Sequence, residues 1–302
     1  MASCRPVFAI AALMAVASAA CSIDVHSQGM SLREEKRFTI SSNQPVEVSV
    51  RTFDGAVQVR SWDKDEVLVE IERRAPDQSG VEALVVNASQ EGNRVLIEAV
   101  QPREERRGMR FGSWVSTSVN VTVTTPRRVT LEARTGDGPI DARELEGAID
   151  LDSGDGRIVA SRIAGRVRIH TGDGSIRIEE TTGRVDADSG DGSVEIDGRL
   201  EGLTVRTGDG AVNVEATDGS AMKEDWRITT GDGGISVRVP DRFNAEIDAH
   251  TGDGSIRVEG IDPPAPQDRD GSDRHDLQGR LGSGGPVLRL RSGDGSIDVS
   301  RR

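Results

Sequence analysis

A tetrapeptide that recurs through the second half of the chain restricts its fold more than any other feature. The motif is Thr or Ser followed by Gly-Asp-Gly, and its first five copies begin 18 residues apart. The copies begin at Thr135, Ser153, Thr171, Ser189, Thr207, Thr230, Thr251 and Ser292. A fixed period of this length is the signature of a protein built from stacked repeats, each of which contacts mainly its neighbours.

Apolar and polar residues alternate on both sides of each motif, as expected for β-strands with one buried face. Aligning the copies gives four apolar columns of eight residues, two before the turn and two after it. The first column after the turn contains Ile140, Ile158, Ile176, Val194, Val212, Ile235, Ile256 and Ile297. One such strand cannot bury its apolar face alone. We therefore predict an all-β protein, a parallel β-solenoid with about 18 residues per coil and Gly-Asp-Gly turns.

The composition agrees with narrow coils. The chain has no Tyr, five Phe and three Trp, so aliphatic residues must supply most of the buried area. Outward positions would place opposite charges beside each other on successive coils, as at Asp150 and Arg168 or at Arg177 and Glu195.

The chain divides into four segments. Residues 1–20 have the features of a signal peptide, and residues 21–37 are expected to form an N-terminal linker. The alternation is weaker over residues 38–130, which predicts a less regular N-terminal β region. The β-solenoid is expected over residues 131–302, with a looped-out insertion at 262–286 that is rich in Pro, Gly and Asp.

Two ways of processing the N-terminus remain open. Arg5 precedes an apolar run over residues 7–20 that is too short to span a bilayer as a helix. Cleavage after Ala19 fits ordinary secretion, whereas the sequence SAAC ending at Cys21 resembles a bacterial lipobox. Lipid attachment would give Cys21 a role, since the chain has only one other cysteine, Cys4, and the signal peptide contains it. We predict an exported protein, an outer-membrane or periplasmic lipoprotein attached to the membrane through Cys21.

Charge excludes one class of partner. Asp and Glu number 51 against 38 Lys and Arg, a net charge of −13, and the whole excess lies beyond residue 130. A nucleic-acid partner is excluded because phosphate binding requires a basic face.

The Asp of each motif is the most regular candidate for chemistry. A file of carboxylates could bind Ca²⁺, but calcium β-rolls place Asp two residues before the buried apolar residue. Gly174 occupies that position before Ile176, so we expect a structural role in which Asp caps the turn amides, and no metal or other cofactor. The residues are Asp137, Asp155, Asp173, Asp191, Asp209, Asp232, Asp253 and Asp294.

The sequence resembles a bacterial family of β-strand-repeat proteins known as putative adhesins, related to the head-GIN type of surface domain. The resemblance covers roughly residues 38–302. It rests on FDGAVQVRSWDKDEVLVE at residues 53–70, on the TGDGSIRIE-type repeats, and on GSGGPVLRLRSGDGSIDV at residues 282–299. It implies a secreted, often lipid-anchored envelope protein and no defined catalytic residues.

These observations favour a non-enzymatic cell-envelope protein, an adhesin or interaction scaffold for an unknown envelope or surface ligand. Two alternatives remain open. One is a β-helix that binds or processes a polysaccharide, and the other is a calcium-dependent surface module.

Overall fold

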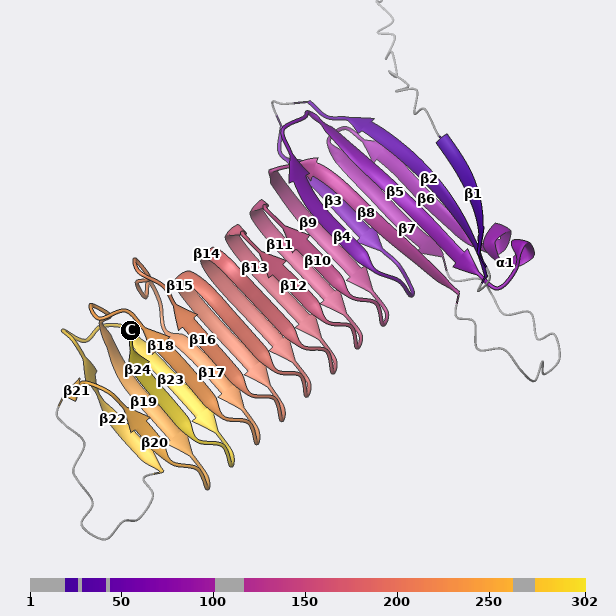
Figure 1. Ribbon diagram of the computed structural model, residues 1–302. Helices are drawn as coiled ribbons and strands as arrows, with labels where there is room; N and C mark the ends of the chain where they lie inside the picture. The colour runs from indigo at the N-terminus through magenta and orange to yellow at the C-terminus, as the bar shows by residue number, and fades with distance from the viewer. Residues whose placement is uncertain (1–19, 27–28, 42–43, 101–116, 263–274) are drawn as a thin grey trace, which may run out of the picture.

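The computed structural model describes residues 20–26, 29–41, 44–100, 117–262 and 275–302. The protein is all-β over these residues apart from one short helix, α1 (Gln78–Ala83). Figure 1 shows the strands stacked side by side in an elongated body. The predicted signal peptide lies outside the described residues except for Ala20, where the first strand begins.

The middle of the stack is regular. Strands from successive coils pair in parallel with an offset of 18 residues, so that Ile149 is in register with Val167, and Ile158 with Ile176. The exception is a register shift between β14 and β15, where residues 181–183 pair at an offset of 17. The strands of this part are β9 (Arg128–Thr135), β10 (Ile140–Arg143), β11 (Glu146–Ser153), β12 (Ile158–Ser161), β13 (Ala164–Thr171), β14 (Ile176–Ser189), β15 (Val194–Thr207) and β16 (Val212–Ala216). The period in the sequence is therefore the separation between residues paired on neighbouring strands.

The four predicted columns form most of the core of the coils from β9 onward, and the buried residues of the N-terminal strands extend this core. Every residue in the four columns is buried except Val258, which is half-buried. Val258 ends β20 (Ile256–Val258), and β20 pairs with only one strand of the described chain, β24 (Ile297–Arg301). The apolar assignment is thus confirmed, and its exception lies at the edge of the stack.

The last coil does not follow the coil that precedes it in the chain. Strand β23 (Val287–Ser292) lies between β17 (Trp226–Thr230) and β19 (Ala245–Thr251) and pairs in parallel with both. Likewise, β24 lies between β18 (Ile235–Val239) and β20. The chain therefore passes to the end of the stack and returns to fill a place one coil back.

The insertion expected at 262–286 is only partly a loop. Residues 263–274 lie outside the described residues. Beyond them, β22 (Asp276–Leu281) pairs antiparallel with β19 and with the short β21 (Ile261–Asp262). The polar composition did not predict this strand because its two buried residues, Leu277 and Leu281, are too few to give a clear alternation.

The N-terminal region contains a further coil. Strands β3 (Val46–Arg51) and β4 (Val57–Trp62) pair in parallel with β9 and β10. On their other side lie β7 (Arg94–Val100) and β8 (Ser118–Pro126), which come later in the chain. Antiparallel strands β5 (Glu66–Ala75) and β6 (Val85–Glu91) then pair with β8 and β7.

The expectation of a linker over residues 21–37 is wrong. Strand β2 (Gly29–Thr39) pairs antiparallel with β5 over ten residues, and β1 (Ala20–His26) pairs with β2. The many charged residues of β2 obscure the alternation that would predict a strand. In the structure, Phe38 is buried near the end of β2, and Glu34 forms an ion pair with Arg73 of β5. Antiparallel strands thus follow the parallel stack at both ends, as capping units do in repeat proteins.

Removal of one whole coil tests the 18-residue unit. Deleting Thr171–Asp188 places Ser189 where Thr171 stands and keeps all four columns in register, so the variant should melt cooperatively with only a modest loss of stability. Deleting Thr171–Glu179 sets a Gly-Asp-Gly turn against the opposite corner. It should cost at least as much as Ile176→Ala, for which about 2–5 kcal/mol is expected.

Circular-dichroism melts would rank the three variants. The one-coil unit would be contradicted if the nine-residue deletion folded and the 18-residue deletion did not.

Candidate functional site

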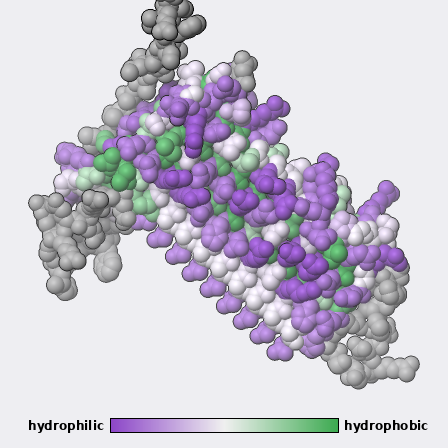
Figure 2. Space-filling view, turned by 180° about the vertical axis from the view of Figure 1, so that it is seen from behind, coloured by the Kyte–Doolittle hydropathy of each residue, from purple (hydrophilic) through white to green (hydrophobic). Residues whose placement is uncertain are grey.

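The turns of successive coils form one edge of the stack, and this edge carries the predicted Asp file. All eight side chains are exposed. Figure 2 shows a row of evenly spaced hydrophilic side chains along one edge, beside a band of residues of neutral hydropathy. Neighbouring strands are about 4.8 Å apart, so the edge repeats its chemistry at that interval.

Hydroxyl groups, not carboxylates, satisfy the turn amides. We expected the Asp side chains to cap these turns, but in five of the eight turns the Thr or Ser hydroxyl of the same motif accepts from the turn amide instead. The Gly192 N–H donates to Ser189 Oγ at 3.1 Å, and this hydroxyl donates to the Gly174 carbonyl of the preceding coil at 3.0 Å. The same pair of bonds recurs at Ser153, Thr230, Thr251 and Ser292.

The two corners of a coil require glycine for different reasons. At the Gly-Asp-Gly turn the requirement is close approach, since a Cβ on Gly174 would lie 2.1 Å from the Gly156 carbonyl oxygen. At the opposite corner it is also backbone conformation, because Gly165 has φ +131°. Because each 18-residue coil has two corners and each corner requires a glycine, glycine recurs every nine residues.

The described residues contain no group of three or more His, Cys, Asp or Glu placed to hold a metal ion. Each turn contributes a single exposed carboxylate. The two histidines beside the turns have carboxylate neighbours: His170 Nδ1 lies 3.4 Å from Asp188 Oδ1, and His250 Nδ1 lies 2.7 Å from Asp276 Oδ1.

Opposite charges meet on successive coils as predicted. Arg177 lies 2.7 Å from Glu195, and Arg168 lies 3.7 Å from Asp150. These side chains are about half exposed, so each pair contributes little to stability.

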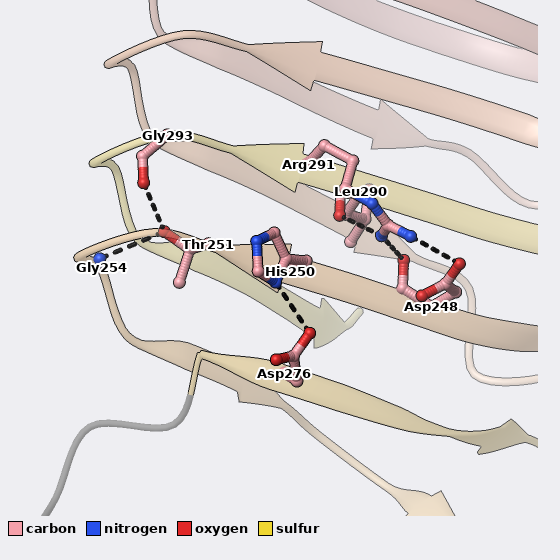
Figure 3. Close-up of polar contacts among 8 residues, drawn as sticks. All are labelled: Asp248, His250, Thr251, Gly254, Asp276, Leu290, Arg291 and Gly293. Atoms are coloured by element: carbon pink, nitrogen blue, oxygen red, sulfur yellow. Dashed lines mark hydrogen bonds and ion pairs between the residues drawn. The ribbon is translucent and has the colours of Figure 1, made fainter.

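A more enclosed polar cluster lies where the last coil is inserted (Figure 3). Asp248 on β19 accepts hydrogen bonds from Arg291 at 2.7 Å and from Arg289 at 3.2 Å, both on β23. The bond from Arg291 holds the pKa of the Asp248 carboxyl below its ordinary value. Arg289 acts in the same direction, and partial burial opposes both. The cluster joins two strands whose adjacency is not evident from the sequence, which gives it a structural role.

The stack also has a pocket at the corner opposite the Gly-Asp-Gly edge, near its N-terminal end. Its volume is about 770 Å³. Trp62, at the end of β4, and Pro126, at the end of β8, are in register and both line it. Lys64 Nζ lies 4.7 Å from the centre of the Trp62 ring.

The sequence did not predict this pocket, although SWDKD at residues 61–65 lies within a segment that carries the family resemblance. The available signal was a tryptophan at a corner position in a chain with only three. The site could not be assembled from sequence because its other walls, Ile40 and Arg127, come from distant segments.

The arrangement defines an all-β protein of stacked coils with a polar turn edge and, near its N-terminal end, a corner pocket of mixed chemistry. The chain belongs to the Toastrack DUF4097 family, which it matches over residues 46–300. In the described part of the chain, no helix is long and apolar enough to cross a membrane.

Solved structures that are similar to this chain share little sequence identity with it. A putative lipid binding protein from Parabacteroides distasonis is 14% identical, with a TM-score of 0.49 over 88% of this chain and 96% of that one. A putative adhesin from the same species is 13% identical, with a TM-score of 0.47 over the same shares of the two chains. A putative adhesin from Parabacteroides merdae is 11% identical, with a TM-score of 0.44 over 88% and 95%. A search of curated proteins finds no match.

The roles of hydroxyl and carboxylate in one turn can be separated by substitution. Thr230→Val keeps the side-chain shape but leaves the Gly233 N–H and the Gly210 carbonyl without the bonds that Thr230 makes at 3.2 and 2.9 Å. We expect it to lower the free energy of unfolding by about 2–4 kcal/mol. The matched control, Asp232→Ala, alters the exposed carboxylate of the same turn and should change it by less than about 0.5 kcal/mol. Urea titrations followed by circular dichroism measure both, and equal losses would contradict the hydroxyl assignment.

The Asp248 cluster should make stability depend on pH. A carboxyl whose pKa is lowered by folding stabilises the protein above its unfolded pKa, about 3.9, and this contribution is lost as the pH falls through the folded value. Asp248→Asn should therefore cost about 1–2 kcal/mol at pH 7, and the difference from wild type should shrink below about pH 4. Asp298→Asn, at an exposed pair with Arg257, should have little effect at either pH. A cost for Asp248→Asn that did not change with pH would indicate that packing, not charge, is responsible.

Proposed function

We propose that this protein is a non-enzymatic interaction scaffold of the cell envelope, with a parallel β-solenoid turned at its Gly-Asp-Gly motifs as its body. The observation that carries the proposal is the stack of strands in register, which repeats each outward column from coil to coil. A long surface with a constant spacing offers many equivalent contacts to an extended or repetitive ligand, and neighbouring coils hold it rigid.

The turn carboxylates support a scaffold better than an enzyme. Acid–base catalysis depends on titratable groups whose environments differ enough to separate their pKa values. The eight Asp residues instead occupy one repeated, exposed environment. Adhesion to an envelope or surface ligand is the role that the resemblance to adhesins and head-GIN-type domains implies, and we carry it over as part of the proposal.

The adhesive role can be tested in the cells that produce the protein. A strain without the protein should adhere several-fold less to its substratum, and the wild-type protein should restore adhesion. A variant with the final coil removed at residue 286 should fail to restore it, since β23 lies inside the stack. Unchanged adhesion in the deletion strain would contradict the adhesive role.

Export and lipid attachment are the second part of the proposal. Cys21 is the second residue of β1, which pairs with β2 among the antiparallel strands that cap the N-terminal end of the stack, so a lipid there would leave the coils free of the membrane. We expect Cys21→Ser to abolish labelling by radioactive palmitate and to release the protein into the soluble fraction.

Cys4→Ser is the matched control, because Cys4 would be removed with the signal peptide, and it should leave both labelling and fractionation unchanged. Full membrane retention of Cys21→Ser without label would contradict lipid anchoring. Soluble wild-type protein that begins at residue 20 would favour cleavage after Ala19.

A further inference from the structure

The corner after β4 is one of the places where the coil repeat is broken. Val57–Arg60 of β4 are in register with Ile140–Arg143 of β10. Two residues further on, Trp62 takes the position that Leu145 holds in the next coil and Ile163 in the one after it. Leu145 and Ile163 are each 1% exposed and close their corners. Trp62 stays partly exposed because the chain does not continue into the next coil but turns away into the antiparallel strand β5.

Three segments meet at this open corner and line the pocket. They are the approach to β3 (Ile40, Pro45 and Val46), the turn after Trp62, and the connection from β8 to β9 through Pro126 and Arg127. The volume of about 770 Å³ lies within the range of small-molecule sites. Its lining combines apolar groups and an indole with polar and charged side chains, the usual make-up of a binding site.

We propose that this pocket binds a saccharide, with the Trp62 indole as the platform for a sugar ring. A sugar presents an apolar face of C–H groups and an edge of hydroxyls, and a tryptophan face of large area matches the first. The indole is already fixed in place, since Nε1–H donates to the Glu66 carbonyl at 2.8 Å. Stacking on a ring that is held in this way costs little conformational entropy.

The polar side chains of the pocket can form hydrogen bonds with the hydroxyl groups of a sugar. Arg127, Asp63 and Asp65 line it, and the structure gives their side chains no ion pair within the described residues. A guanidinium donates and carboxylates accept, so together they can satisfy both roles of neighbouring hydroxyl groups.

Charge balance favours an uncharged sugar over an anion. The lining contains three cationic side chains, Lys64, Arg127 and Arg128, and three anionic ones, Asp63, Asp65 and Glu146. Arg128 and Glu146 are 3.5 Å apart, and Lys64 Nζ, 3.7 Å from Glu66, lies over the indole on an exposed side chain that can move aside. A pocket with no net charge has no strong attraction for a phosphate or a uronic acid.

This inference rests on the proposed scaffold, for which it supplies a ligand class, but it can fail separately. The test uses the full chain carrying Cys21→Ser, so that the lipid does not interfere. The probe is a printed array of uncharged, amino-sugar and uronic-acid oligosaccharides. The strongest binder is then titrated by calorimetry in about 0.05 M and about 0.5 M NaCl, which screens attraction between exposed charges.

We expect an uncharged oligosaccharide to bind with the same Kd at both salt concentrations. Trp62→Ala and Arg127→Ala should each raise Kd at least tenfold, whereas Trp62→Phe, which keeps an aromatic platform, should raise it less. The control is Arg227→Ala on β17, which removes another exposed arginine without an ion pair in the described chain and should leave Kd unchanged. Thermal melts check that each variant is folded.

Three results would overturn the proposal: no saccharide bound by the wild-type chain, binding of acidic sugars alone that disappears in high salt, or a Kd that neither Trp62→Ala nor Arg127→Ala alters. If cells carrying Trp62→Ala still adhered normally, the scaffold would stand and only the saccharide site would fall.

Discussion

The contact between one Gly-Asp-Gly turn and the next is the constraint on which the stack depends. Each turn brings glycine backbone so close to the preceding coil that a Cβ at Gly174 would lie 2.1 Å from the Gly156 carbonyl oxygen. At this distance the buried hydroxyl of the motif can reach both coils, accepting from its own turn and donating to the one before. All eight hydroxyls donate to a glycine carbonyl of the neighbouring coil, and five of them also accept from an N–H of their own turn. Buried backbone groups that would otherwise lack partners are thereby satisfied along the stack, which fixes its spacing and register.

Because the turns fix the register, the core can be simple. Short aliphatic side chains fill the interior in columns, and the outward positions are left to charges that pair from coil to coil. Two of the described aromatic residues are buried together where the coils are less regular. Trp226 is buried at a position that Leu203 and Leu288 occupy in the adjacent coils, and it packs on Phe243 with ring centres 5.2 Å apart. A large ring thus enters the core near the inserted last coil, where the period of 18 has already been lost.

The ends of the stack are built differently from its middle, because a parallel coil with no neighbour would leave a row of unpaired backbone N–H and C=O groups. At the C-terminal end the chain inserts its last coil and pairs β22 with β19. At the N-terminal end β1, β2, β5 and β6 supply antiparallel strands. This second solution opens the corner at Trp62, because the chain has to leave the coil path there. Capping and the corner pocket are thus two consequences of one change in direction, and sites that break a local rule are where function is expected.

The sequence alone determined the strand class, the 18-residue offset, the buried columns and the positions of the turns, because each of these repeats locally and is read from neighbouring residues. The first residue of every motif is Thr or Ser, and this shared hydroxyl was a signal for the group that bonds the turns, although the Asp carboxylate was the more conspicuous side chain. Only the tertiary structure decided the order of the coils at the two ends, the strands within residues 21–37 and 275–286, and the meeting of Ile40, Trp62 and Arg127 around one pocket. These features depend on pairing between segments far apart in the chain. Any of several similar coils could have accepted β23 as a neighbour, and only the packing of the complete stack distinguishes them.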